Sequence, residues 1–253
     1  MSTVATGPGR YLDPWAPLRA TTQARIGLGR AGVSLPTAAV LDLQVSLAAA
    51  RDAVHVPLDV DALLTGLAGL GIGEPIVLSS QAPDRSAYLR RPDLGRLPAS
   101  VDGLPDDGWD VGFVIADGLS SKAVAEHAVP MMTALVAALG TGLSLAPPVV
   151  VTQARVAVAD AIGQAMGLGT VLVLIGERPG LSVADSLGIY LTHAPVPGRN
   201  DAERNCISNI HPPEGLSYVA AAKTALNLLH GARALGRSGV DLKDTSGQVP
   251  QVS

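Results

Sequence analysis

The chain has 253 residues, 47% of them hydrophobic and 16% charged, so it is long enough to bury a large core. Its net charge of −4 and the lack of any basic block argue against a nucleic-acid partner, because neutralising phosphates requires clustered Lys and Arg. The single cysteine, Cys206, cannot form an intrachain disulfide, and the N-terminal residues lack the charged and apolar regions of a secretory signal.

The N-terminal part of the chain predicts helices and no strands. Residues 1–20 are rich in Gly, Pro, Ser and Thr and predict a loose leader. Ser34 and Pro36 then predict the start of a helix whose apolar residues recur at helical spacing. A shorter helix is expected to follow, capped by Asp59. Together these helices make up a predicted N-terminal helical extension over residues 21–73.

Residues 74–253 are predicted to form one α/β domain. From residue 110 onward, β-branched strands alternate with helices, which is typical of βαβ units and a mainly parallel sheet flanked by helices. No charge occurs between Glu126 and Arg155, but glycines and prolines interrupt that stretch. It therefore predicts a helix and then a strand, and we expect no membrane partner.

The segment GLGRAG matches the dinucleotide-binding pattern G-x-G-x-x-G at Gly27, Gly29 and Gly32. That fingerprint requires a buried strand directly before the first glycine, and the preceding ATTQARI is too polar to be one. A turn of packed glycines is the favoured interpretation. A stand-alone NAD(P)-dependent oxidoreductase that uses these glycines is the alternative hypothesis.

Polar residues follow two of the predicted strands. In ADGLSSKAV, Asp117 or Ser120 is expected to cap a helix, and a direct contact with a ligand is less favoured. In GERPG, Glu177 can accept hydrogen bonds from amides, and Arg178 can donate hydrogen bonds from its rigid, planar guanidinium. A surface salt bridge is the plainer explanation of this turn. Because open α/β sheets bind ligands at the carboxyl ends of their strands, we favour a ligand site.

The segment DAERNCISNIHPP combines a thiol with a potential base, Cys206 and His211. A nucleophilic thiolate would need that base close by, but a small buried thiol is the simpler interpretation. The spacing of Cys and His excludes a zinc site. We therefore predict no catalytic set and no metal site in this chain, which suggests a protein that holds a cofactor for chemistry performed elsewhere.

Several segments together resemble the small (light) subunit of ethanolamine ammonia-lyase. They are RIGLGRAG, SLPT, RDAVH, PLD, ADGLS, LIGERPGLS, DAERNCISNIHPP and SGVDLKD, and they occur in order from about Asp13 to Asp244. The resemblance implies a Rossmann-like domain that contacts cobalamin, at the interface with a large TIM-barrel subunit that carries most catalytic groups. It also implies conversion of ethanolamine to acetaldehyde and ammonia, a hexamer of large–small pairs, and a cytoplasmic location, inside or outside a bacterial microcompartment.

The resemblance assigns cofactor contacts to Val156, Glu177 and Cys206. In it, Glu177 accepts hydrogen bonds from the amide-bearing rim of the corrin, and Cys206 packs against the ligand without acting as a nucleophile. None of the five histidines lies in the pattern D-x-H-x-x-G, by which other cobalamin proteins replace the nucleotide base. Adenosylcobalamin is therefore expected to bind base-on.

Overall fold

A computed structural model describes residues 13–244, and the chain divides into two compact units, residues 1–48 and 49–253. The first twelve residues of the predicted leader lie outside the described residues. The first unit contains α1 (Ala16–Arg19) and the start of α2 (Thr37–His55). The boundaries predicted for leader, extension and domain stay a prediction.

The GLGRAG segment lies in the first unit, where Gly32 is part of a turn closed by backbone hydrogen bonds between Ala31 and Ser34. Gly27 has a φ of +59°, and a Cβ there would overlap the indole of Trp15, so this glycine lets the ring pack directly on the backbone. Arg19 donates hydrogen bonds to the carbonyl oxygens of Ile26 (3.1 Å) and Gly27 (3.0 Å). No strand of the described part of the chain precedes the motif, and α2 starts only at Thr37. This geometry lacks the strand–turn–helix that a dinucleotide site requires.

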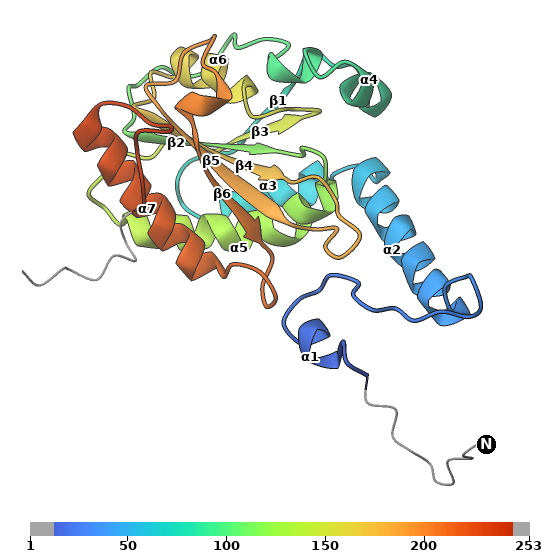
Figure 1. Ribbon diagram of the computed structural model, residues 1–253. Helices are drawn as coiled ribbons and strands as arrows, with labels where there is room; N and C mark the ends of the chain where they lie inside the picture. Colours follow the sequence, from blue (N-terminus) through green and yellow to red (C-terminus); the bar gives the residue numbers. More distant parts are fainter. Residues whose placement is uncertain (1–12, 245–253) are drawn as a thin grey trace, which may run out of the picture. The chain divides into compact units, whose positions relative to one another are not determined.

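The second unit is built on one mixed sheet of six strands in the order β1-β3-β2-β4-β5-β6 (Figure 1). β1, β3, β2 and β4 are parallel, and β5 is antiparallel to both β4 and β6. The strands are β1 (Ile76–Ser79), β2 (Val111–Ala116), β3 (Val149–Thr152), β4 (Thr170–Gly176), β5 (Leu187–His193) and β6 (Asn205–Ile210). The predicted α/β class is confirmed, and the closer likeness to a Rossmann fold stays a prediction.

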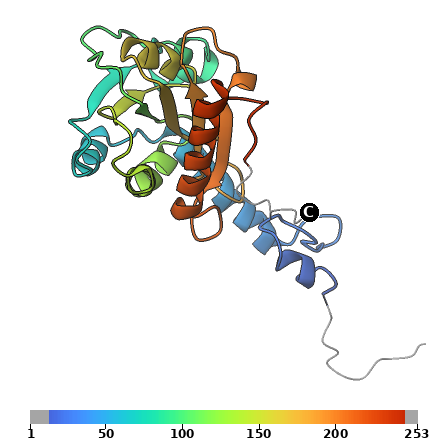
Figure 2. The same cartoon turned by 90° about the vertical axis from the view of Figure 1, so that its left-hand side faces the viewer.

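Helices cover both faces of this sheet (Figure 2). Alternate residues of β2 separate into two cores, because successive side chains of a strand point to opposite faces. Phe113 and Ile115 pack in one core with α3, α5 and α7, whereas Val114 and Ala116 pack in the other with α6. These helices are α3 (Val60–Ala68), α5 (Ser121–Leu139), α6 (Val158–Ala165) and α7 (Tyr218–Leu235).

Two elements have little helix or strand signal of their own in the sequence. α4 (Arg85–Arg90) forms within the basic, proline-rich segment, capped by Asp84, whose side chain accepts a hydrogen bond from the Ala87 amide. β6 is an edge strand, and its exposed residues include Cys206, Ser208 and Asn209. A half-exposed edge strand needs little apolar alternation, so its sequence gives only a weak strand signal.

α5 is the one helix among the described residues that is long and apolar enough to cross a membrane. Its apolar face is instead part of the core, where Val124, Met131 and Leu135 pack against the sheet and α7. The predicted helix, glycine stop and strand are all found, with Gly140 at the C-cap of α5.

Candidate functional site

A pocket of about 440 Å³ lies at the carboxyl ends of β2, β3 and β4. After β2 the chain continues into α5 on one face of the sheet, and after β3 it continues into α6 on the other face. Such a reversal opens a crevice between neighbouring strands, and it is where open α/β sheets bind ligands. The lining residues are Tyr88, Leu119, Arg155, Val156, Ile175, Gly176, Glu177, Arg178 and Tyr190.

The loop that carries Val156 is held by Asp117. This carboxylate is buried and accepts hydrogen bonds from the backbone N–H groups of Gln153 (2.9 Å) and Ala154 (3.0 Å). Burial raises the pKa of Asp117, while those amides and Arg85 act in the opposite direction. The cap of α5 is Ser120, which accepts from the Ala123 amide at 3.1 Å. Asp117 thus positions the β3–α6 loop and does not cap the helix.

Glu177 lines the pocket, but its carboxylate is turned towards β5 and β6. Its Oε2 accepts a hydrogen bond from the Ser186 hydroxyl (2.5 Å) and one from the backbone N–H of Asn209 (3.3 Å). A Cβ on Gly188 would lie 2.9 Å from Oε1, so the glycine allows the carboxylate to lie across β5. Arg178 is exposed, and the described residues contain no ion pair between it and Glu177. The turn is therefore not built around a salt bridge.

Cys206 lies beside the pocket and is exposed in this chain, whereas the sequence suggested a buried thiol. Its side chain faces Tyr190, the residue opposite it on β5, and the two side chains hydrogen-bond. Partial burial of the sulfur and the charge of Glu177 raise the pKa of the Cys206 thiol, and the Tyr190 contact lowers it. Since the thiolate is the nucleophilic form, a raised pKa argues against a nucleophile.

His211 and Arg204 do not serve Cys206. His211 is buried, and its Nε2 lies 2.8 Å from the Asn209 Oδ1. Arg204 binds Asp160 instead, as described below. Among the described residues no group of three or more His, Cys, Asp or Glu could hold a metal ion.

The structure adds an arginine–tyrosine cluster that the sequence did not predict. Tyr88 of α4 is fully buried, with the guanidinium carbons of Arg85 and Arg155 at 4.7 Å and 4.6 Å from its ring centroid. Burial raises the pKa of Tyr88 to about 12, although Arg155 lowers it. Its hydroxyl donates to the Ala154 carbonyl at 3.2 Å. These residues come from α4 and from the loop after β3, so no local spacing could have revealed them.

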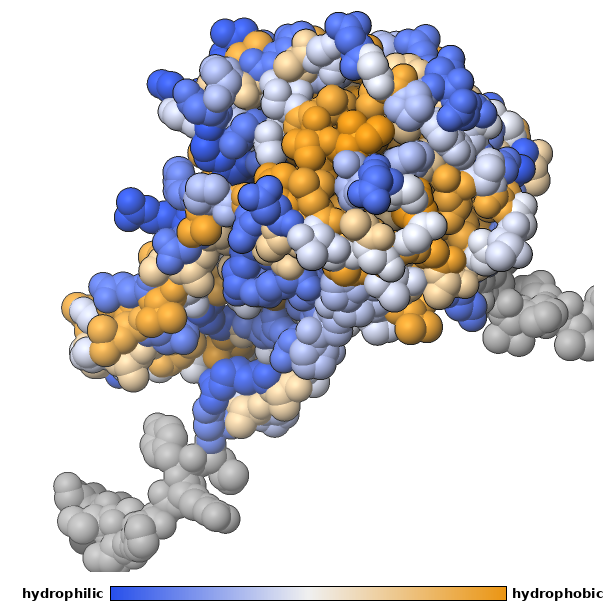
Figure 3. Space-filling view, turned by 180° about the vertical axis from the view of Figure 1, so that it is seen from behind, coloured by the Kyte–Doolittle hydropathy of each residue, from blue (hydrophilic) through white to orange (hydrophobic). Residues whose placement is uncertain are grey.

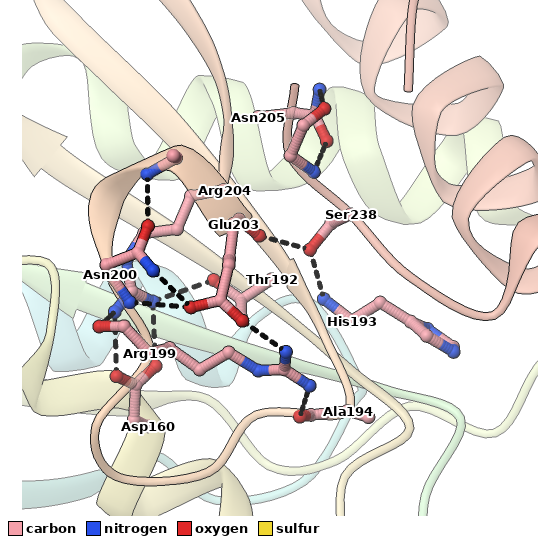
Figure 4. Close-up of polar contacts among 12 residues, drawn as sticks. Asp160, Thr192, His193, Ala194, Arg199, Asn200, Glu203, Arg204, Asn205 and Ser238 are labelled. Atoms are coloured by element: carbon pink, nitrogen blue, oxygen red, sulfur yellow. Dashed lines mark hydrogen bonds and ion pairs between the residues drawn. The ribbon is translucent and has the colours of Figure 1, made fainter. Parts of the chain in front are cut away.

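A buried ion pair ties α6 to β5 and the start of β6 (Figure 4). The two terminal nitrogens of Arg204 each donate to one carboxylate oxygen of Asp160 at 2.7 Å. Arg204 also donates to the Thr192 hydroxyl at 2.9 Å and to the Arg199 carbonyl at 3.0 Å. Asp160 follows the Val156 loop and Arg204 precedes Cys206, so this pair fixes two of the three predicted contact segments.

Comparison with known proteins identifies the family of the chain. Residues 12–243 match the model of the family described as ethanolamine ammonia-lyase light chain (EutC). The chain belongs to the ethanolamine ammonia-lyase light-chain family. A relative named ethanolamine ammonia-lyase small subunit, from Rhodococcus erythropolis, is 61% identical over 235 residues, covering 93% of this chain and 91% of its own. Small subunits from Azotobacter vinelandii (52% over 241 residues; 92% and 88%) and Ralstonia nicotianae (49% over 247 residues; 94% and 90%) are also similar.

Proposed function

We propose that this light-chain family member acts as the small subunit of an adenosylcobalamin-dependent ethanolamine ammonia-lyase. With its large subunit it would convert ethanolamine to acetaldehyde and ammonia. The observation that carries the proposal is the family match, which runs almost from end to end of the chain. The raised pKa of the Cys206 thiol supports a subunit that leaves the catalytic groups to its partner.

The pocket at the strand ends fits one side of a cobalamin. Val156 offers apolar surface, the Glu177 carboxylate can accept hydrogen bonds from corrin amides, and Cys206 would pack at the edge of the ligand. An unpartnered buried donor in the pocket, Nε of Arg155, also favours a bound group. When bound, adenosylcobalamin supplies the radical chemistry, and the residues named here hold and orient it. We propose base-on binding, because no histidine of the sequence lies in D-x-H-x-x-G.

A partner chain is supported by exposed apolar residues. Apolar side chains gather in patches on the face shown in Figure 3. The exposed large hydrophobic residues of the chain include Val33, Leu41 and Val45. Extensive exposed apolar surface is typical of protein–protein interfaces. We propose a large TIM-barrel subunit as this partner, in a hexamer of large–small pairs that acts in the cytoplasm, free or within a bacterial microcompartment.

Co-purification tests the proposal. The tagged chain, expressed together with the large subunit and supplied with cobalamin, should retrieve the large subunit and show the cobalamin absorption spectrum. The alternative, a stand-alone oxidoreductase, would instead bind a nicotinamide cofactor without a partner. Retrieval of no large subunit, together with tight nicotinamide binding by the chain alone, would contradict the proposal.

A further inference from the structure

The pocket contains a charged donor that the chain itself leaves unused. Nε of Arg155 is buried and has no hydrogen-bond partner. The rest of the residue is anchored, because its backbone N–H donates to the Gly95 carbonyl at 2.7 Å and its terminal nitrogen lies 3.5 Å from the Tyr88 carbonyl. Arg199 and Arg204 also have an unpartnered buried Nε, but each of them pairs with a carboxylate and lies outside the pocket. Arg155 lines the pocket without such a pair, and an anchored guanidinium of this kind points to a partner outside the chain.

The surroundings of Arg155 are positively charged. Arg85 also lies over the Tyr88 ring, and its NH2 is likewise buried without a partner. Its charge is balanced by Asp117, 3.4 Å away. Arg178 adds a second positive charge at the rim, and no ion pair of the described residues involves either Arg155 or Arg178. The pocket therefore presents two guanidinium groups that form no ion pair within the described chain, which favours a ligand with an anionic oxygen.

Glu177 places a negative group in the same pocket, and this restricts the ligand further. An anion that filled the whole pocket would be repelled by that carboxylate. A ligand that combines amide donors with one separate anionic group would match both Glu177 and Arg155. Cobalamin has this combination, because its rim carries carboxamides and its nucleotide arm carries a single phosphodiester.

We infer that Arg155, held in place by Tyr88, recognises the phosphodiester of the nucleotide arm of cobalamin. The inference rests on the proposed function and assigns a role to a residue outside the contacts expected at Val156, Glu177 and Cys206. A guanidinium suits this task because its planar fork matches phosphate oxygens and keeps its charge at any physiological pH.

Three corrinoids that differ in the nucleotide arm can distinguish a contact with the phosphate from contacts with the corrin amides. Cobalamin and cobinamide phosphate both carry the phosphate, whereas cobinamide lacks it and keeps the corrin amides. Each would be titrated by absorption spectroscopy into the complex of both subunits, with wild-type chain, Arg155→Met, Arg155→Lys and the control Arg96→Met. Arg96 is an exposed arginine that does not line the pocket.

Arg155→Met should weaken the binding of cobalamin and of cobinamide phosphate by about ten-fold or more, because a hydrogen bond to a charged group is lost. Cobinamide affinity should stay within about two-fold, which also shows that the pocket is folded. Arg155→Lys should retain part of the phosphate-dependent affinity, and Arg96→Met should change nothing. Equal losses for all three corrinoids, or no loss for any, would overturn the inference while the proposed function stands. A wild-type complex that binds none of them would overturn the proposed function and the inference with it.

Discussion

Arg204 and Arg155 are both packed into the second unit, but they differ in the groups that pair with their guanidinium charges. Arg204 has 1% of its side chain exposed, and its terminal nitrogens donate to Asp160, Thr192 and the Arg199 backbone, while its Nε lies 3.8 Å from Asp201. Arg155 stacks on Tyr88, and no carboxylate of the described chain pairs with it. Nε lacks a hydrogen-bond partner in both residues, so the difference lies in the carboxylate that pairs with Arg204. An arginine paired with a buried carboxylate stabilises the fold, whereas an arginine without such a pair in a pocket is available to a ligand. We therefore expect Arg204 to contribute to the stability of the fold and Arg155 to contribute to ligand binding.

The largest expected effect comes from breaking the buried pair of Asp160 and Arg204. Asp160→Asn leaves the Arg204 guanidinium buried without its counter-charge, which should lower the free energy of unfolding by about 3–5 kcal/mol. Urea denaturation of the full chain measures this. The control Asp201→Asn, at the exposed partner of Arg204, should cost less than about 1 kcal/mol. Replacing both buried partners with apolar residues, as in Asp160→Leu with Arg204→Met, should recover much of the loss. A loss below about 1 kcal/mol for Asp160→Asn would show that the pair is not structural.

A substitution at Glu177 tests whether the pocket residues contribute to cofactor binding. Glu177→Gln keeps the shape but removes the charged acceptor, so cobalamin affinity of the two-subunit complex should fall by about ten-fold or more. Spectroscopic titration measures the affinity, and Glu74→Gln, an exposed residue outside the pocket, is the matched control. Unchanged affinity for Glu177→Gln would leave the turn with a structural role only.

Asp110 and Arg233 form a pair of intermediate exposure. Hydrogen bonds from Ser144 and Arg233 lower the pKa of Asp110 to about 2. A lowered pKa stabilises the fold above the unfolded pKa of about 3.9, and this stabilisation is lost as the pH falls through about 2. About a third of the side chain is exposed, so the solvent-screened contribution is about 1 kcal/mol.

Asp110→Asn should therefore reduce stability at pH 7 by about 1 kcal/mol, well below the effect at Asp160. The difference from wild type should shrink as the pH is lowered from about 4 towards 2. Denaturation at a series of pH values checks this, with the exposed Asp107→Asn as control. A difference that stays constant over that range would argue against the hydrogen-bonded carboxylate as its cause.

The smallest effect is expected at Cys206. Because its thiol has a raised pKa and no base beside it, Cys206→Ala and Cys206→Ser should retain most turnover at saturating cofactor. Cobalamin affinity should weaken at most modestly, since only packing is lost. If either variant abolished turnover while cobalamin still bound at full occupancy, Cys206 would be a participant in the reaction.

Local signals in the sequence predicted the elements that depend on local chemistry. Asp59 caps α3 as expected, and its side chain accepts from the Ala62 amide at 3.0 Å. α7 ends at Leu235, where Gly236 adopts a left-handed conformation. The turn at Glu177 does follow a buried strand, because seven consecutive apolar or small residues of β4 are recognisable without any partner.

The features that the sequence did not predict depend on distant partners. β6 is stabilised by pairing with β5, so its polar residues carry little signal of their own. The contacts of Tyr88 with Arg85 and Arg155 join α4 to a loop beyond β3, and the role of Asp117 depends on backbone amides of that same loop. Asp160 and Arg204 are 44 positions apart in the chain. No local pattern distinguishes Arg204, which pairs with a buried carboxylate, from Arg155, which does not.

We propose that this chain holds the cofactor for a reaction whose catalytic groups belong to the large subunit. The most direct test assays deamination of ethanolamine with adenosylcobalamin in three samples: the chain alone, the large subunit alone, and the two combined. We predict turnover only in the combined sample, with weak cobalamin binding at most by this chain alone. Turnover by the isolated chain comparable to that of the combined subunits would contradict the account.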